Sequence, residues 1–264
     1  MPRSALINVM VQAVSKAGRS LTRDFGEVEN LQVSRKGPAD FVTAADQRAE
    51  DILRRELQKA RPNYGFLMEE SGVIEGNDGI HRWIIDPLDG TTNFLHSIPA
   101  FAVSVALEKN GRLEAGVVYN PISQDLFTAE RGGGAYLNDR RLRVAQRKDL
   151  HDCVIATGIP HLGRGDHGLF LKELAGTMTE AAGVRRCGAA SLDLAWVAAG
   201  RFDGYWERDL SAWDVAAGIV LVREAGGFVT DLDDRDKMLD NGSIIAGNED
   251  VHRKLLAVIK QARD

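Results

Sequence analysis

The hydrophobic residues of the first 60 positions recur at the spacing of an α-helix. They share one face in a segment that carries Leu6, Val9, Met10, Ala13, Val14 and Ala17. This spacing predicts an amphipathic helix over residues 4–24. A second helix is expected to start after VTAAD and to run through QRAEDILRRELQKA, where Pro62 and Asn63 close it.

Short apolar runs separated by turn residues follow these two helices. YGFLMEES and RWIID each predict a strand, and residues 101–121 predict a hairpin around Asn110–Gly111. LFTAE adds another strand, and a glycine-rich turn, RGGGAYLN, is expected after it. The first half of the chain therefore predicts helices packed on an antiparallel sheet.

Strands and helices alternate after about residue 150, which favours an α/β arrangement. Strands are expected in CVIATG, VRRCG, DGYWE, GGFVTDL and SIIAG. Helices are expected in HGLFLKELAGTMTEA, AASLDLAWVAAG, AWDVAAGIVLVREA and EDVHRKLLAVIKQA. The charged stretch RRLRVAQRKDLHD fits a connection, so we place the boundary between the halves near residue 145, dividing 1–145 from 146–264.

Composition and charge narrow the class of protein. The 264 residues are 44% hydrophobic and carry a formal net charge of -5, which argues against a non-specific nucleic-acid binder. Cys153 and Cys187 lack CxxC spacing, which argues against a disulfide framework or a zinc knuckle. No apolar run reaches the roughly 18 residues of a membrane span. We therefore expect a cytoplasmic protein without a membrane partner.

Acidic residues border apolar sequence in three separate places. Glu69 and Glu70 follow YGFLM, Asp86 and Asp89 follow RWII, and Asp214 lies in AWDVAAG. A carboxylate beside buried sequence costs free energy unless it is paired or binds a metal. The shared context favours one site that all three places help to build.

The turn DPLDGTT offers groups for both a cation and an anion. Asp86 ends the strand, and Asp89 lies close enough along the chain to point into the same space. Gly90 lets the backbone approach another group closely, and Thr91 begins what resembles the first turn of a short helix, whose free N–H groups attract anions. Oxygen ligands without His or Cys favour Mg²⁺. A cation beside a phosphate cradle is the layout of metal-assisted phosphoryl hydrolysis.

A simpler interpretation exists for each acidic place taken alone. DPLDG is also a favourable solvent-exposed turn, a Glu-Glu pair is usually a surface feature, and Asp214 is well placed to cap the helix that follows it.

The motifs together resemble the inositol monophosphatase family of magnesium-dependent, lithium-sensitive phosphatases. WIIDPLDGTTNF matches the first hallmark of that family and AWDVAAG the second, while EES and DFVTAAD fit its intermediate motifs. They occur in the family's order and span nearly the whole chain, and RRCGAASLDLAWVAAGRFDGYWE is closest to the bacterial subgroup. The resemblance implies one domain over 1–264 with a layered α-β-α-β-α sandwich of the sugar phosphatase type, and a homodimer.

The resemblance also implies a set of two or three Mg²⁺ ions and their ligands. Glu69 would bind the first ion and a third, and Asp86 would bridge the first two. The carbonyl of Leu88 would also coordinate the first ion, and Asp89 and Asp214 would hold the second.

Catalytic and substrate roles are implied in the same way. Thr91, supported by Asp46, would orient the attacking water, and the N–H groups of Gly90 and Thr91 would bind phosphate. Glu207 matches the glutamate that binds the polyol, and the segment Gly188–Ala189–Ala190 would contact substrate hydroxyls, with Glu70 farther out. The catalytic set implied is Thr91, Asp46, Glu69 and Asp86. The substrate-contacting set implied is Glu69, Asp89, Gly90, Thr91, Gly188, Ala190, Glu207 and Asp214.

Several of these residues have other interpretations. Glu207 is also compatible with an exposed strand end, although the substrate role is favoured, and Asp46 is compatible with a plain helix cap, with or without its catalytic role. Lys36 lies either near the site or in a solvated loop, and Arg185 and Arg186 meet a substrate, a dimer partner or nothing. The six histidines show no ligand spacing.

The resemblance leaves the substrate and a second role open. The leading interpretation is hydrolysis of myo-inositol monophosphate, and the alternatives are histidinol phosphate or another small ester. Some bacterial relatives act as partners of the transcription machinery, and such a role has a candidate surface in the basic cluster Arg140, Arg141, Arg143, Arg147 and Lys148. A solvated linker is the simpler interpretation of that cluster. A metal-dependent regulator without turnover is a third, weaker hypothesis.

Overall fold

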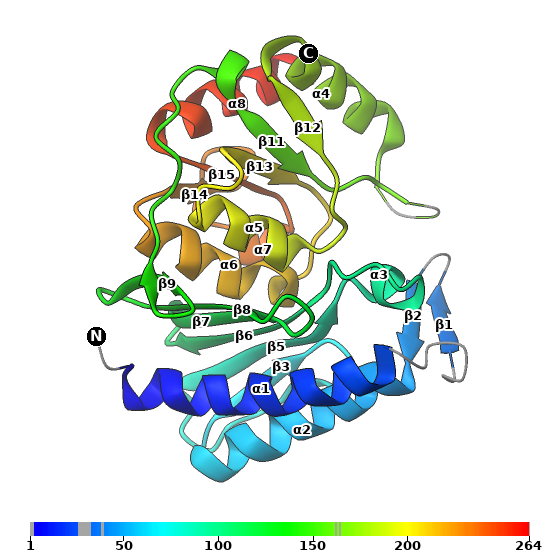
Figure 1. The fold of residues 1–264 in the computed structure, drawn as a ribbon, viewed down its shortest axis with the longest axis vertical. Coiled ribbons are helices and arrows are strands. Elements are labelled where there is room, and N and C mark those ends of the chain that lie inside the picture. The colour runs from blue at the N-terminus through cyan, green and yellow to red at the C-terminus, as the bar shows by residue number, and fades with distance from the viewer. Residues whose placement is uncertain (1–2, 26–32, 38–39, 162, 164, 264) are drawn as a thin grey trace.

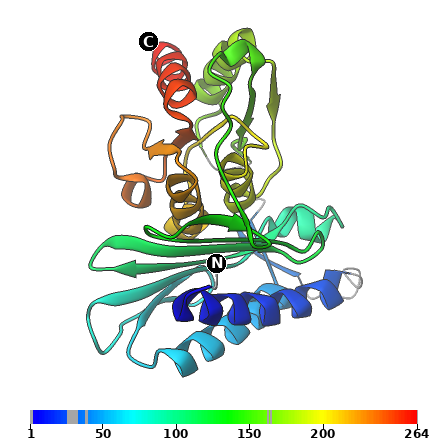
Figure 2. The same ribbon diagram turned by 60° about the vertical axis from the view of Figure 1, so that its left-hand side comes forward.

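The computed structural model describes residues 3–25, 33–37, 40–161, 163 and 165–263, and for residues 33–37 and 40–43 it describes the backbone. Its elements stack as alternating helix and sheet layers (Figure 1). Helices α1 (Ala5–Phe25) and α2 (Ala44–Ala60) lie side by side beneath a large sheet (Figure 2). Both helices are amphipathic, and their apolar faces form a core with that sheet.

The large sheet has eight strands in the order β10-β9-β8-β7-β6-β5-β3-β4. Their bounds are β3 (Gly65–Met68), β4 (Gly72–Ile74), β5 (His81–Asp89), β6 (Ala102–Lys109), β7 (Arg112–Asn120), β8 (Asp125–Glu130), β9 (Gly134–Leu137) and β10 (Arg140–Arg141). The predicted hairpin is present as β6 and β7. The expected antiparallel sheet is not uniform, because β3 pairs with β5 in parallel. The turn predicted over RGGGAYLN covers too many residues, because β9 forms inside that segment and pairs with β8.

A middle helical layer covers the other face of the large sheet. It consists of α5 (Ala190–Ala198) and α6 (Ala212–Glu224), both apolar on nearly all sides. A methyl group on Gly116 of β7 would lie 2.6 Å from the carbonyl oxygen of Ala217 in α6, so the helix packs directly on the sheet backbone. Such helices need burial on two sides, which a layer between two sheets provides.

A second sheet lies above this middle layer. Its order is β12-β11-β13-β15-β14, with bounds β11 (Val154–Thr157), β12 (Gly183–Arg185), β13 (Gly204–Glu207), β14 (Phe228–Thr230) and β15 (Ile244–Gly247). Helices α4 (His167–Glu180) and α8 (Glu249–Gln261) cover its outer face (Figure 1). The layers therefore run α-β-α-β-α, which confirms the predicted fold class. The division at residue 145 stays a prediction.

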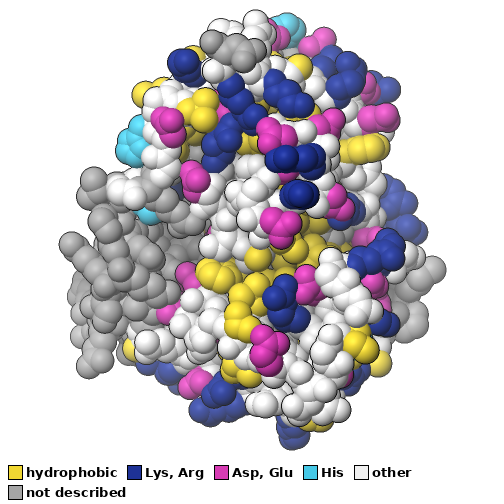
Figure 3. Space-filling view, turned by 180° about the vertical axis from the view of Figure 1, so that it is seen from behind, with side chains coloured by type: hydrophobic (Ala, Val, Ile, Leu, Met, Phe, Trp, Pro, Cys, Tyr) yellow, Lys and Arg dark blue, Asp and Glu magenta, His cyan; other side chains and the backbone are white. Residues whose placement is uncertain are grey.

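The remaining elements lie at the margins of these layers. They are β1 (Val33–Gly37), β2 (Asp40–Thr43), α3 (Thr91–Leu95), the 3₁₀ helix Leu150–Asp152 and α7 (Met238–Asn241). On the reverse side of the molecule, hydrophobic side chains gather in a hollow between the upper and lower layers (Figure 3). No helix in the described part of the chain is long and apolar enough to cross a membrane.

Candidate active site

The two aspartates of DPLDG point to the same face of the large sheet because β5 carries a bulge between them. Asp86 pairs with Ser104 of β6 and Asp89 with Ala102, so three steps along β5 match two along β6. Residues three apart in a regular strand point to opposite faces. The extra residue corrects this and turns both carboxylates toward the middle helical layer.

Three carboxylates, those of Glu69, Asp89 and Asp214, lie around Asp86, which is 2% exposed. Burial raises the pKa of Asp86 well above its ordinary value, and the charges of Glu69, Asp89 and Asp214 raise it further. The backbone N–H of Leu88 donates to Asp86 Oδ1 at 2.9 Å. The sequence motifs that carry these four acids thus come together at one place, as predicted.

Different elements deliver the four carboxylates. The parallel pairing of β3 with β5 brings Glu69 beside Asp86, and the N–H of Glu69 donates to the carbonyl of Ile85 at 3.2 Å. Asp214 lies in the first turn of α6, where it accepts from the N–H of Ser211 at 2.7 Å. This bond is half of a capping box whose N-cap is Ser211, so Asp214 supports the start of its helix from inside the first turn and is not the N-cap that its simpler interpretation made it.

Asp89 is fixed by the start of α5. Its Oδ2 accepts hydrogen bonds from the N–H and the hydroxyl of Ser191, at 2.7 and 2.5 Å. Burial raises the pKa of Asp89 to about 6, although bonds from the Ser191 side chain and from the N–H groups of Ser191, Ala190 and Leu192 lower it. One carboxylate therefore connects the metal motif of the first half with the segment around Ala190 in the second half.

Thr91 and Asp46 are in contact, as the resemblance implied. The Thr91 hydroxyl lies 3.1 Å from Asp46 Oδ1 and 3.0 Å from the carbonyl oxygen of Leu88, so its proton can be donated to either. Asp46 is buried in the first turn of α2. Gly90 has φ 92°, and a methyl group there would lie 2.9 Å from the carbonyl oxygen of Ala100, so this position requires glycine.

The predicted substrate segment lies next to this turn. Gly188 has φ +84°, and the amide of Asn93 donates to the carbonyls of Cys187 at 2.8 Å and Ala100 at 2.7 Å. Asn93 is 4% exposed. It therefore joins the turn after β5 to the segment that precedes α5.

Glu207 belongs to the same cluster, although it comes from β13 of the second sheet. The hydroxyl of Tyr205 donates to its Oε2. Burial raises the pKa of Glu207 to about 7 against the effect of that bond, and the charges of Asp214 and Asp89 raise it further. Glu207 is thus close to the metal-ligand candidates and is not an exposed strand end.

Sequence reasoning missed several residues that support the site. Glu50 of α2 is 3% exposed and accepts from the N–H of Glu70 at 2.9 Å and from the Ser71 hydroxyl. The helical pattern could have indicated this role, because Glu50 falls on the buried face of α2 with Ala49 and Leu53. Ser191 gave no comparable signal, since its contact with Asp89 spans 102 residues.

The remaining candidates are two arginines, which have different contacts, and one lysine, whose side chain is not described. The Arg185 guanidinium donates to the neighbouring carbonyl of Val184, whereas that of Arg186 lies near Gly188. The side chain of Lys36 lies outside the described residues.

The donor set fits Mg²⁺ by its chemistry. It consists of carboxylate and carbonyl oxygens, the ligands that hard divalent cations prefer. Among the residues that the structure describes, no three His, Cys, Asp or Glu side chains are grouped closely enough to hold an ion as they stand.

Comparisons with known proteins identify the family and the fold. The sequence profile of the "Inositol monophosphatase family" matches residues 3–264. An inositol-1-monophosphatase of Mesorhizobium japonicum is 67% identical over 261 residues, covering 99% of this chain and 98% of that one. The Escherichia coli protein "Nus factor SuhB" is 43% identical over 252 residues, covering 96% and 94%. The crystal structure of extragenic suppressor protein suhB from Bartonella henselae is 62% identical, with a TM-score of 0.96 over 98% of this chain and 99% of that chain.

Proposed function

The chain belongs to the inositol monophosphatase family, and on that basis we propose that it is a Mg²⁺-dependent hydrolase that releases phosphate from myo-inositol monophosphate. The observation that carries the proposal is the meeting of Glu69, Asp89 and Asp214 around buried Asp86. A bound cation would neutralise acids gathered in this way. A purely structural turn would not gather four acids from three separate elements.

Members of the family are generally Mg²⁺-dependent. For this chain we assign the first ion to Glu69, Asp86 and the Leu88 carbonyl, and the second to Asp86, Asp89 and Asp214, with Glu69 also available to a third. Bound Mg²⁺ would neutralise the charge that develops on the phosphoryl oxygens and would lower the pKa of bound water.

The protein's own groups would orient the water and the ester. Thr91 donates its hydroxyl proton to Asp46, which leaves its oxygen lone pairs free to accept a hydrogen bond from water. The N–H groups of Gly90 and Thr91 would hold the phosphate, while Glu207, Gly188 and Ala190 would bind the hydroxyls of the leaving group. Water would attack phosphorus directly and in line, without a phosphoenzyme.

The experiment is phosphate release by the purified protein with and without Mg²⁺. The substrates are myo-inositol monophosphate, histidinol phosphate, fructose bisphosphate and phosphoadenosine phosphate. A strong Mg²⁺-dependent preference for the inositol ester is expected, and a preference for histidinol phosphate or another ester would revise the substrate. Asp86→Asn and Asp214→Asn are expected to lose nearly all turnover with the fold retained, and full activity in either variant would contradict the metal assignment.

We further propose a cytoplasmic homodimer, which analytical ultracentrifugation tests directly. A transcription role is the second candidate function, favoured by the name of the Escherichia coli relative. Its test should use Arg140, Arg141 and Arg143, because Arg147 is engaged by buried Asp203 at 2.6 Å. Reversing those three charges is expected to abolish capture of RNA polymerase, with turnover intact, if that role is present. A metal-dependent regulator is the third candidate, which bound Mg²⁺ without turnover on any ester would favour.

A further inference from the structure

We propose that Gly158 and Tyr205 are positioning residues that fix the carboxyl group of Glu207 and thereby select esters whose leaving group carries hydroxyls. The inference rests on the proposed function, because it assigns Glu207 to the leaving group. Neither residue needs to touch the substrate. Each acts through Glu207, a carboxylate that belongs to the second sheet.

Gly158 leaves the space that the Glu207 carboxyl occupies. Strand β11 pairs in parallel with β13, with Thr157 opposite Trp206, so Gly158 follows directly beside Glu207. A methyl group on Gly158 would overlap both carboxyl oxygens and the carbon between them. The backbone of Gly158 is outside the left-handed region, so the glycine is not required by its conformation. What it provides is room for a side chain from the neighbouring strand.

Tyr205 holds the same carboxyl group through a hydrogen bond. Residues two apart in a strand point to the same face, so Tyr205 and Glu207 stand side by side on β13. Tyr205 is fully buried, and its hydroxyl donates to Glu207 Oε2. A hydrogen bond to a carboxylate is charge-assisted, so the Tyr205 hydroxyl holds the Glu207 carboxyl group in one orientation.

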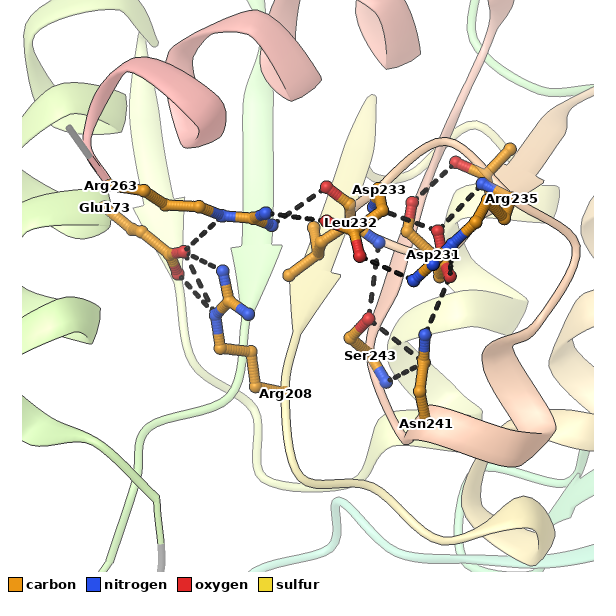
Figure 4. A network of polar contacts seen from close by, with 10 residues as sticks. Glu173, Arg208, Asp231, Leu232, Asp233, Arg235, Asn241, Ser243 and Arg263 are labelled. Carbon is orange, nitrogen blue, oxygen red and sulfur yellow. Dashed lines mark hydrogen bonds and ion pairs between the residues drawn. The ribbon is translucent and has the colours of Figure 1, made fainter.

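The chain is also anchored directly after Glu207. Arg208 follows Glu207, and its Nε donates to Glu173 of α4 at 3.0 Å (Figure 4). Glu173 is completely buried and also faces Arg263 at 3.9 Å. This ion-pair network limits how far the backbone at Glu207 can shift, so an added methyl group at Gly158 has to displace the carboxyl group itself.

A displaced Glu207 carboxyl group should affect some esters and not others. A carboxylate held beside Asp89 and Asp214 accepts hydrogen bonds only from a leaving group that has hydroxyls to donate. An ester such as p-nitrophenyl phosphate has none. Displacing Glu207 should therefore harm the hydrolysis of inositol monophosphate and spare that of the nitrophenyl ester.

The test compares both esters in Gly158→Ala and Tyr205→Phe. Each variant is expected to raise KM for inositol monophosphate by roughly tenfold, the equivalent of one charge-assisted hydrogen bond, with kcat changed much less. Hydrolysis of p-nitrophenyl phosphate should change less than twofold. Gly168→Ala is the matched control, because exposed Gly168 in α4 has room for a methyl group. Equal losses on both esters in a folded variant would overturn the proposal.

A double-mutant cycle tests whether Gly158 acts through Glu207. In a Glu207→Ala background there is no carboxyl group to displace, so Gly158→Ala should have no further effect on KM. A further tenfold rise would overturn the proposal. A crystal structure of Gly158→Ala supplies a readout without activity, and a Glu207 carboxyl left in place would also overturn it. Failure of the unchanged protein to hydrolyse either ester would instead refute the proposed function, and the crystal structure would still decide the positioning.

Discussion

The carboxylate cluster predicts that Asp86→Asn stabilises the protein while it destroys activity. In the metal-free state Asp86 is a buried acid whose neighbours Glu69, Asp89 and Asp214 all oppose its ionisation. The substitution removes that charge and keeps the shape of the side chain. Its amide oxygen can still accept the bond from the N–H of Leu88, which Asp86 accepts at 2.9 Å. A loss of packing is therefore not expected.

The magnitude follows from the spacing of the acids. Two unit charges repel by about 4 kcal/mol at a separation of about 4 Å, and by half of that at twice the distance, when the effective dielectric constant is about 20. The raised pKa of Asp86 allows a bound proton to relieve part of this repulsion, so we use the smaller of the two values. We expect the free energy of unfolding to rise by about 2 kcal/mol, which raises Tm by about 4–8 °C for a chain of this size.

The assay is thermal unfolding in EDTA and then with increasing Mg²⁺. Without metal, Asp86→Asn should melt above the unchanged protein, and with Mg²⁺ the order should reverse, since the variant has lost an ion ligand. Glu75→Gln neutralises an exposed acid outside the cluster and is the control. A variant that melts below the unchanged protein in EDTA would refute the electrostatic reasoning.

The same cluster predicts a pH dependence of metal-free stability. The folded-state pKa values of Asp89, about 6, and Glu207, about 7, lie above their ordinary values. Such groups stabilise the fold at low pH, and that contribution is lost as the pH rises through the folded pKa. In EDTA we therefore expect a higher Tm at pH 5.5 than at pH 8, and the pH dependence should weaken when Mg²⁺ is present. A metal-free Tm that rises over this range would contradict the assignment.

Three further perturbations separate the roles of the site residues. Thr91→Val should lower kcat roughly 100-fold or more with the fold intact, because it removes the hydroxyl that would orient water, and exposed Thr92→Val is the kinetic control. Asn93→Ala should lower Tm and raise KM, because two carbonyls lose their donor; an unchanged KM would separate Asn93 from the substrate segment. Millimolar LiCl, compared with NaCl in the phosphate-release assay, should inhibit turnover, and no inhibition would count against the family's usual site.

Local sequence patterns were enough to predict most of the fold. The amphipathic segment predicted over residues 4–24 corresponds to α1, and the segment QRAEDILRRELQKA lies in α2. Asn110–Gly111 marked the hairpin of β6 and β7. The parallel contact of β3 with β5 was not predictable from these patterns, because it joins strands whose connection includes another strand, β4. Strand β9 was missed because glycines dominate the segment in which it forms. Pairing with β8 overrides that local preference.

At the site, the motifs identify the acidic residues, whereas the packing of distant segments determines how those residues are oriented. The sequence pattern identified the acids and the resemblance gave them roles, but the bulge that turns Asp86 and Asp89 to one face is visible only in the pairing of β5 with β6. Ser191 and Gly158 were invisible for a related reason, since each matters only because a distant segment is packed beside it. Residues of this kind hold the acids in place and give room to Glu207. Under the proposed positioning, substrate preference in this chain depends on Gly158 and Tyr205 as well as on the motif that identifies the family.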